Sequence, residues 1–174
     1  MNSGRKAGSA EYRIEPLGSN HDRAGFSCGV PELDAYLQRQ ASQDLKRNLA
    51  AVFILTADGT KVAGFYTLSA HSILAADLPP EMAKKLPRFP LPFTLLGRMA
   101  VVQSLQGQGW GEFLLLHALN RAWLGSRQVA SWGVVVDAKA GARDFHLKHS
   151  FTPLVEQPDR LFLPTATIEQ LFEE

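Results

Sequence analysis

Blocks of hydrophobic residues, separated by polar stretches rich in glycine and proline, run along the whole chain and predict alternating strands and helices. Runs rich in β-branched and aromatic residues predict strands over residues 12–16, 52–56, 62–69, 93–102, 129–136, 152–155 and 161–163. The pair Asp58-Gly59, between the second and third of these runs, is typical of a β-hairpin turn.

Helical spacing of apolar residues predicts helices over residues 31–40, 81–86, 109–124 and 138–149. The first begins with proline and acidic residues, and Leu33, Tyr36 and Leu37 share one of its faces. With the short helix over residues 81–86 left out, the order is β, α, three β, α, β, α, β, β. It predicts an α/β fold of the mixed α+β type, with a parallel pair of strands around the start of the third helix.

The length and composition predict a single domain. Residues 1–10 are small and polar and are expected to form a frayed terminus, which leaves residues 11–174 for one core. The net charge is only +1, so no global field favours nucleic acid. The longest apolar runs are too short to span a bilayer, and the N-terminus lacks the apolar core of a signal peptide. A single cysteine, Cys28, suits a reducing cytoplasm, where we expect the protein to act.

The stretch VVQSLQGQGWGEFLL, residues 101–115, joins a predicted strand to a predicted helix through a glycine-rich turn. Backbone amides at a helix start lack internal partners and carry the positive end of the helix dipole, so they bind phosphate well. Gly107, Gly109 and Gly111 leave those amides uncovered. The turn lacks the Gly-Lys-Ser/Thr of a nucleoside-triphosphate loop and the spacing of a dinucleotide fingerprint. The alternative is that the glycines only make a tight strand-to-helix turn.

QGQGWG, residues 106–111, matches the Q/R-x-x-G-x-G/A signature of the GNAT superfamily of N-acetyltransferases, and LGRMAV, residues 96–101, resembles that superfamily's fourth strand. Three further segments resemble a narrower group, the acetyltransferase toxins of bacterial toxin–antitoxin pairs. They are CGVPELD, GFYTLS and RLFLP, at residues 28–34, 64–69 and 160–164. The resemblance covers nearly the whole chain and implies a GNAT fold, with six to seven strands and flanking helices.

The resemblance also implies a function. Members of this group bind acetyl-coenzyme A and acetylate the amino group of aminoacyl-tRNA, which stops translation. It further implies a homodimer and a ribbon-helix-helix antitoxin as partner. The backbone of Met99 to Val101 is expected to pair with the pantetheine arm, and the turn amides, with Gln106, to hold the pyrophosphate. The implied cofactor-binding residues are Met99, Ala100, Val101, Gln106, Gly107, Gln108, Gly109, Trp110 and Gly111; the Trp110 ring itself is expected to pack against the sheet.

The chain departs from the family pattern where the chemistry is expected. In KAGARDFHLKHSF, residues 139–151, His146 stands where the family has a tyrosine that protonates the departing thiolate, and Ser150 replaces a glycine. Three interpretations stay open. His146 is the catalytic general acid, in which case activity improves as the pH falls. Alternatively, water protonates the thiolate and His146 only lines the pocket. In the third interpretation, the transfer step is lost.

Other polar residues are weaker candidates. On the third strand Ser69, His71 and Ser72 could face the substrate amine, with His71 as a base or as a structural histidine. Arg39, Lys46 and Arg47, like Lys84, Lys85 and Arg88, could contact tRNA phosphates or simply be solvated. His146 and His149 share a helical face, but no acid or cysteine completes a ligand set, so no metal is expected.

Two classes of function therefore remain. The first is an acetyl-coenzyme A-dependent N-acetyltransferase, most simply a toxin acting on aminoacyl-tRNA, although a small amine or a protein N-terminus is an alternative acceptor. The second is a degenerate, non-catalytic acyl-coenzyme A-binding module. The residue at position 146 separates them.

Overall fold

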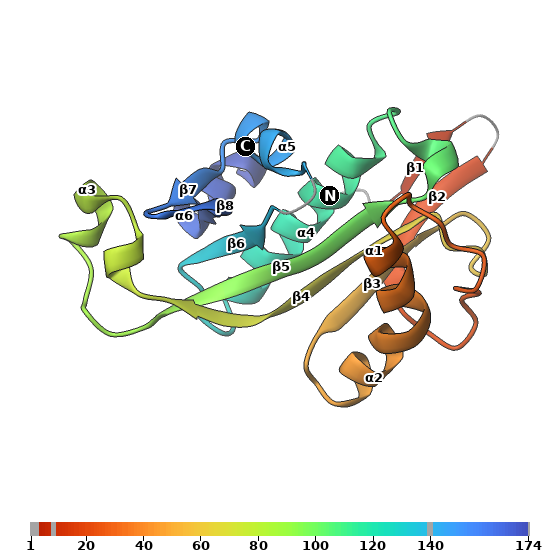
Figure 1. Ribbon diagram of the computed structural model, residues 1–174, viewed down its shortest axis with the longest axis horizontal. Helices are drawn as coiled ribbons and strands as arrows, with labels where there is room; N and C mark the ends of the chain where they lie inside the picture. The colour runs from red at the N-terminus through yellow and green to blue at the C-terminus, as the bar shows by residue number, and fades with distance from the viewer. Residues whose placement is uncertain (1–3, 8–9, 139–140, 174) are drawn as a thin grey trace. The chain divides into compact units, whose positions relative to one another are not determined.

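The structure, a computed structural model, describes residues 4–7, 10–138 and 141–173 (Figure 1). The strands are β1 (Gly4–Ala7), β2 (Ala10–Pro16), β3 (Ala51–Thr56), β4 (Gly64–Ile73), β5 (Leu91–Val101), β6 (Gly133–Asp137), β7 (Thr152–Leu154) and β8 (Gln157–Pro164). The α-helices are α1 (Pro31–Ala35), α2 (Ala41–Lys46), α3 (Pro80–Ala83), α4 (Trp110–Ser126), α5 (Arg143–Lys148) and α6 (Thr165–Phe172). The shorter helical turns are η1 (Tyr36–Gln40, π-helical), η2 (Ala75–Asp77) and η3 (Gln103–Leu105).

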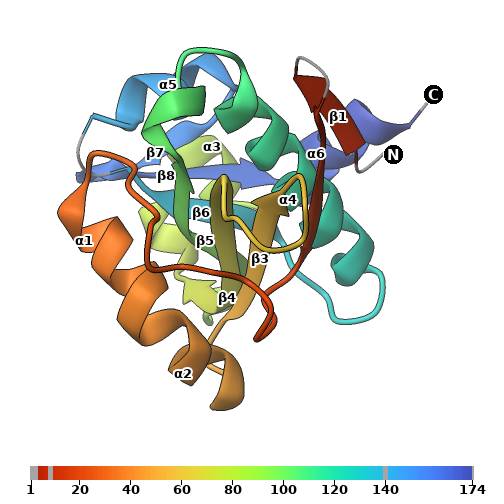
Figure 2. The same ribbon diagram turned by 90° about the vertical axis from the view of Figure 1, so that its right-hand side faces the viewer.

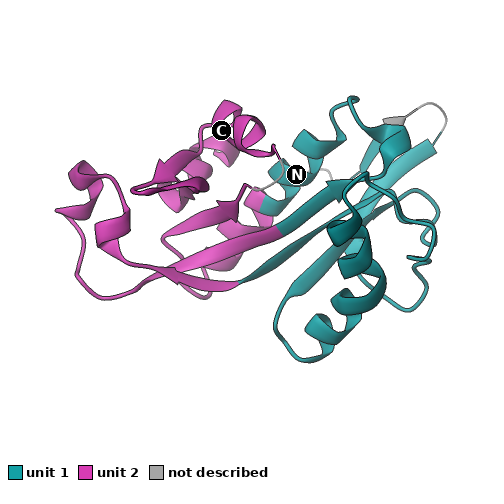
Figure 3. Ribbon diagram, viewed as in Figure 1, with its two compact units in different colours: residues 1–69, 98–118 teal, residues 70–97, 119–174 magenta. Residues whose placement is uncertain are grey.

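The chain forms two compact units (Figure 3). Unit 1 takes residues 1–69 and 98–118, and unit 2 takes residues 70–97 and 119–174. Strands β4 and β5 and helix α4 contribute residues to both units. In unit 1, β1 pairs with β2, β2 with β3 and β3 with β4, each time antiparallel.

In unit 1, helices lie on both faces of the strands. On one face lies the helical segment that includes α1 and α2 (Figure 2). Its Tyr36 and Leu37 are buried in one apolar cluster with Val52 and Phe65. On the other face lies the start of α4. A Cβ on Gly64 would come within 2.9 Å of the Ala100 carbonyl oxygen and 3.2 Å of Leu114 Cδ1. Glycine therefore permits the close approach of β4 to β5 and α4 at this point.

Unit 2 contains the parallel pair. β5 and β6 run parallel, from Phe93 opposite Gly133 to Leu96 opposite Val136. β6 pairs antiparallel with β8, and β8 antiparallel with β7. Its core is made of buried apolar residues from these strands and from the segment before β5, including Leu78, Phe93, Val135, Leu154 and Phe162.

The predicted mixed α/β fold and the parallel pair are confirmed, and each strand predicted from the sequence is present with shifted ends. The sheet has eight strands among the described residues rather than six to seven. The frayed terminus is wrong for Gly4–Ala7, which pair with β2 as β1. Residues 129–132 lie before β6, and Val129 is 80% exposed, so its β-branched side chain was a misleading strand signal. Helix α6 was not predicted at all.

The single domain over residues 11–174 stays a prediction. Two residues of the predicted helix over 138–149, Lys139 and Ala140, lie outside the described residues. Where the chain is described, the helix begins at Arg143 and ends at Lys148. Within the described ranges, none of the helices combines the length and the hydropathy needed to cross a membrane.

Candidate functional site

The glycine-rich turn lies in unit 1 between η3 and α4. Gly107 and Gly109 have φ angles of 77° and 87°, in the left-handed region that favours glycine. A Cβ on Gly107 would meet no atom within 4 Å, so the space beside this part of the turn is open. The Phe113 amide bonds to the Gly109 carbonyl at 3.1 Å as the first turn of α4 closes.

The amides that precede this first helical hydrogen bond, those of Trp110 and Gly111 among them, have no partner within the helix. Helix α4 extends from Trp110 to Ser126, and its dipole places partial positive charge at this end. The predicted anion-binding turn therefore has both the exposed glycine backbone and the helix start that such a site needs.

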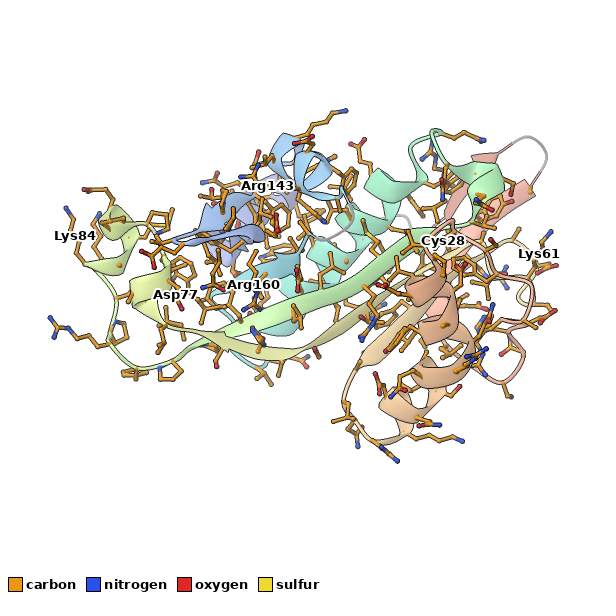
Figure 4. All side chains as sticks on the ribbon, in the orientation of Figure 1. Cys28, Lys61, Asp77, Lys84, Arg143 and Arg160 are labelled. Atoms are coloured by element: carbon orange, nitrogen blue, oxygen red, sulfur yellow. The ribbon has the colours of Figure 1, made fainter. Side chains whose placement is uncertain are left out.

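The two glutamines of the turn support it. The Gln106 side-chain amide donates to the carbonyl oxygens of Cys28, at 2.7 Å, and Val101, at 2.8 Å. Both of its hydrogens are thereby used, so the side chain offers no further donor to an anion. Gln108 donates in the same way to the Ser104 carbonyl at 3.2 Å. Gln106 thus holds the turn against the end of β5 and against Cys28, which is labelled in Figure 4, while Gln108 holds it to η3.

Sequence reasoning missed Arg5, which reaches the turn from β1. Its guanidinium donates to the carbonyl oxygens of Gly109 and Gln108, at 2.9 Å each. It also lies over the Trp110 ring, with Cζ 4.4 Å from the ring centroid. The only signal in the sequence was an arginine in a polar segment, and nothing in its spacing linked it to residues more than a hundred positions away.

Trp110 begins α4 and is 1% exposed. Its ring packs against Tyr12 of β2, with centroids 4.8 Å apart, and against Phe113, at 5.6 Å. This confirms the expectation that the ring packs against the sheet. The indole is therefore an anchor for the helix start.

Among the described residues, the end of β5 extends beyond its ladder with β6. The ladder between β5 and β6 ends at Leu96 and Val136, while β5 continues to Val101. The Ala100 carbonyl points toward β4, and the Val102 amide bonds to the Ala63 carbonyl at 2.9 Å. Because backbone groups alternate along a strand, those of Met99 and Val101 point to the opposite edge. Of the three residues predicted for the pantetheine arm, these two have the required direction, and the Val101 carbonyl already accepts a hydrogen bond from Gln106.

His146 lies in unit 2, on α5, and is 5% exposed. Its ring packs edge-to-face against Phe145 and Phe151, each with centroids 5.2 Å away. Nδ1 is buried and has no hydrogen-bond partner among the described residues. Burial, and to a lesser extent the nearby charge of His149, lowers the pKa of His146 to about 4. The imidazole is therefore neutral at physiological pH.

His71, the candidate base, is hydrogen-bonded to an arginine, and both residues belong to unit 2. Arg160, labelled in Figure 4, donates from its terminal nitrogen to His71 Nε2 at 2.9 Å. Burial and then the Arg160 charge lower the pKa of His71. The nitrogen that a base would use already accepts a hydrogen bond, which favours the structural interpretation. Ser69 and His71 share one face of β4, whereas Ser72 points to the other.

The remaining candidates are surface residues. Arg39 lies in η1, Lys46 ends α2 and Arg47 follows it, and all three are exposed. All three belong to one helical segment of unit 1. Ser150, which stands where the family has glycine, has a φ angle of 72°, the conformation that glycine adopts most easily. In the part of the chain that the structure describes, no cluster of histidine, cysteine and acidic residues could hold a metal ion.

No protein-family model matches the chain, but individual proteins do. A probable toxin TacT from Sinorhizobium fredii (strain NBRC 101917 / NGR234) is 34% identical over 175 residues, which cover 94% of this chain and 97% of that protein. A tRNA-acetylating toxin from Mycobacterium tuberculosis (strain ATCC 25618 / H37Rv) is 33% identical over 143 residues, 82% of this chain and 85% of that protein.

Solved structures extend the similarity to the backbone. AtaT complexed with acetyl-methionyl-tRNAfMet superposes with a TM-score of 0.87 at 35% identity, covering 93% of this chain and 99% of that chain. A tyrosine-to-phenylalanine mutant of AtaT, bound to the C-terminus of the antitoxin AtaR and to acetyl-CoA, gives a TM-score of 0.82 at 32% identity. It covers 94% of this chain and 99% of that one.

Proposed function

Because this chain belongs to the family of tRNA-acetylating toxins, within the GNAT superfamily of N-acetyltransferases, we propose that it transfers the acetyl group of acetyl-coenzyme A to the amino group of an aminoacyl-tRNA. Acetylation of that amino group removes the nucleophile that peptide-bond formation requires, so translation is blocked. The observation that carries the proposal is the glycine turn at the start of α4, in a chain similar over most of its length to a tRNA-acetylating toxin and to AtaT, solved with acetyl-methionyl-tRNAfMet.

The residues of unit 1 fit the cofactor. Open space beside Gly107 and the left-handed backbone at Gly109 leave room for a diphosphate against the amides of Gly107 to Gly111. The backbone groups of Met99 and the amide of Val101, on the edge of β5, can pair with the pantetheine arm, as an added strand would. Acetyl-coenzyme A supplies the activated thioester. The protein's part is to hold that thioester in a fixed orientation for the incoming amine.

His146 favours water as the proton donor to the departing thiolate. With a pKa of about 4, fewer than about one in a thousand imidazoles is charged at pH 7.5. A neutral, buried imidazole is a poor acid, so the surroundings of His146 favour protonation of the thiolate by water over the general-acid interpretation. If water is the proton donor, protonation of His146 is not expected to raise the activity as the pH falls.

The partners follow the relatives. AtaT binds the antitoxin AtaR through the antitoxin's C-terminus, and we propose an antitoxin of the ribbon-helix-helix type for this chain. We also propose that residues 11–174 act as one catalytic domain, in a homodimer, in the cytoplasm. The exposed Arg39, Lys46 and Arg47 supply positive charge for the tRNA backbone.

The proposal is tested by incubating the protein with acetyl-labelled coenzyme A and charged tRNA, and then locating the label. Label on the aminoacyl group is expected. Label on a small amine or a protein N-terminus instead, when these are offered in parallel, would assign a different acceptor. Saturable binding of acetyl-coenzyme A without transfer to any acceptor would identify a non-catalytic module and reject the enzyme.

Gly109→Ala is expected to raise the KM for acetyl-coenzyme A by about 10- to 100-fold. A Cβ at this φ of 87° is strained, and it would lie 3.3 Å from two Arg5 nitrogens. Losing one charge-assisted hydrogen bond from the turn amides weakens binding by about this factor. Steady-state kinetics at varied acetyl-coenzyme A measures the change.

Gly125→Ala is the matched control. Gly125 lies near the end of the same helix, and a Cβ there would meet no atom within 4 Å. The control is expected to keep the wild-type KM and to gain roughly 0.5–1 kcal/mol of helix stability. Equal KM values for the two variants would contradict the assignment of the turn to the cofactor.

A further inference from the structure

We propose that Arg5 is a positioning residue for cofactor binding, which fixes the direction of two backbone amides in the glycine turn. This inference rests on the function proposed above, because those amides are taken to hold the diphosphate of acetyl-coenzyme A. Arg5 acts through the turn and needs no contact with the cofactor.

The direction of the amides follows from peptide geometry. Arg5 donates from one terminal nitrogen to the Gln108 carbonyl and from the other to the Gly109 carbonyl, each at 2.9 Å. No cis peptide bond occurs among the described residues. In a trans peptide the C=O of one residue and the N–H of the next point in opposite directions. Fixing these two carbonyls toward Arg5 therefore turns the amides of Gly109 and Trp110 away from it, toward the side on which an anion would lie.

A turn of this composition needs such a restraint. Glycine has the largest conformational freedom of any residue, so the peptides around Gly107 and Gly109 can rotate unless something holds them. The planar guanidinium presents two parallel donors, a geometry that one ammonium group cannot reproduce. The restraint makes the turn rigid before the cofactor arrives, and preorganisation of this kind increases affinity.

The β1–β2 hairpin delivers Arg5 to this position. Arg5 lies directly opposite Tyr12 in the antiparallel register. Both side chains contact the Trp110 ring, Tyr12 with centroids 4.8 Å apart and Arg5 with Cζ 4.4 Å from the centroid. The cross-strand pair of Arg5 and Tyr12 thus packs on Trp110, the first residue of α4. The Arg5 guanidinium also bonds to the carbonyls of the two residues that precede Trp110.

The test compares the KM for acetyl-coenzyme A and kcat of the full-length wild type, Arg5→Ala, Arg5→Lys and Arg13→Ala. Arg5→Ala is expected to raise KM about tenfold and to leave kcat at saturating cofactor within about twofold. Arg5→Lys keeps the charge but cannot bond both carbonyls in the same way, so its KM is expected to lie closer to that of Arg5→Ala. Arg13 is on the same hairpin and pairs with Glu15 at 3.0 Å. Its removal takes away the same charge and is expected to leave KM unchanged.

The outcomes separate this inference from the function on which it rests. A wild type that neither binds acetyl-coenzyme A nor transfers its acetyl group rejects the proposed function. If the KM of Arg5→Ala equals that of the wild type, the role of Arg5 is overturned, while the proposed function stands. Full rescue by Arg5→Lys also overturns it, because charge without the two-pronged geometry would then suffice. If Arg5→Ala does not fold, Arg5→Lys and Arg13→Ala still decide between charge and orientation.

Discussion

Trp110→Ala lowers the free energy of unfolding by about 3–5 kcal/mol, the expected loss when a fully buried tryptophan is truncated in a packed core. The ring is 1% exposed and contacts Tyr12, Phe113 and the Arg5 guanidinium. Its removal leaves a cavity under the first turn of α4 and releases the β1–β2 hairpin from the helix start. Denaturant unfolding followed by circular dichroism measures the change.

Trp123→Ala is the control on the same helix. Trp123 is half-buried and stacks on Phe172 of α6, with centroids 5.8 Å apart. Because less apolar surface returns to water, its loss is expected to be about half of that of Trp110→Ala or smaller. If Trp110→Ala costs no more than Trp123→Ala, the indole at position 110 is not the anchor described above.

Between pH 6.5 and pH 4, the free energy of unfolding of His146→Phe is expected to fall by about 3 kcal/mol less than that of the wild type. Burial lowers the folded-state pKa of His146 from its ordinary value of 6.5 to about 4. Above pH 6.5 the histidine is neutral in both states and the stability is fully present. As the pH falls toward 4, the unfolded chain binds a proton that the folded chain does not, so folding loses about 3 kcal/mol. Phenylalanine keeps an aromatic ring between Phe145 and Phe151 but cannot titrate.

The measurement is the free energy of unfolding of wild type and His146→Phe at several pH values from 7.5 to 4. The difference between the two proteins, rather than either curve, isolates this residue, because His71 and the carboxylates titrate in both. Parallel curves would mean that His146 is open to solvent with an ordinary pKa. The interpretation of His146 as a general acid, with activity rising on acidification, would then return.

The glycine turn could be predicted because its signal is local. The order of strand, glycines and helix is written in consecutive residues, and the left-handed angles at Gly107 and Gly109 are those that glycine spacing implies. The parallel pairing of β5 with β6 followed in the same way from a strand, a helix and a second strand in sequence.

The contact of Arg5 with the glycine turn could not be predicted because it joins residues far apart in the chain, and the burial of His146 could not be predicted either. The segment around Arg5 is polar and short, and only the hairpin register with Tyr12 brings it to Trp110. From the sequence alone only the ordinary pKa of histidine could be assumed for His146, whereas burial in the structure lowers this pKa. Val129 shows the converse, since its β-branched side chain indicated a strand where the chain is exposed.

The binding of the cofactor diphosphate by the glycine turn is tested most directly by nuclear magnetic resonance. The measurement follows the backbone amide resonances of Gly107, Gly109, Trp110 and Gly111 while acetyl-coenzyme A is added. These signals are expected to shift and to saturate at the same cofactor concentration as acetyl transfer, and inorganic pyrophosphate is expected to shift the same signals at higher concentration. If acetyl-coenzyme A binds and reacts while these amide resonances do not shift, the binding of the diphosphate by the turn is contradicted.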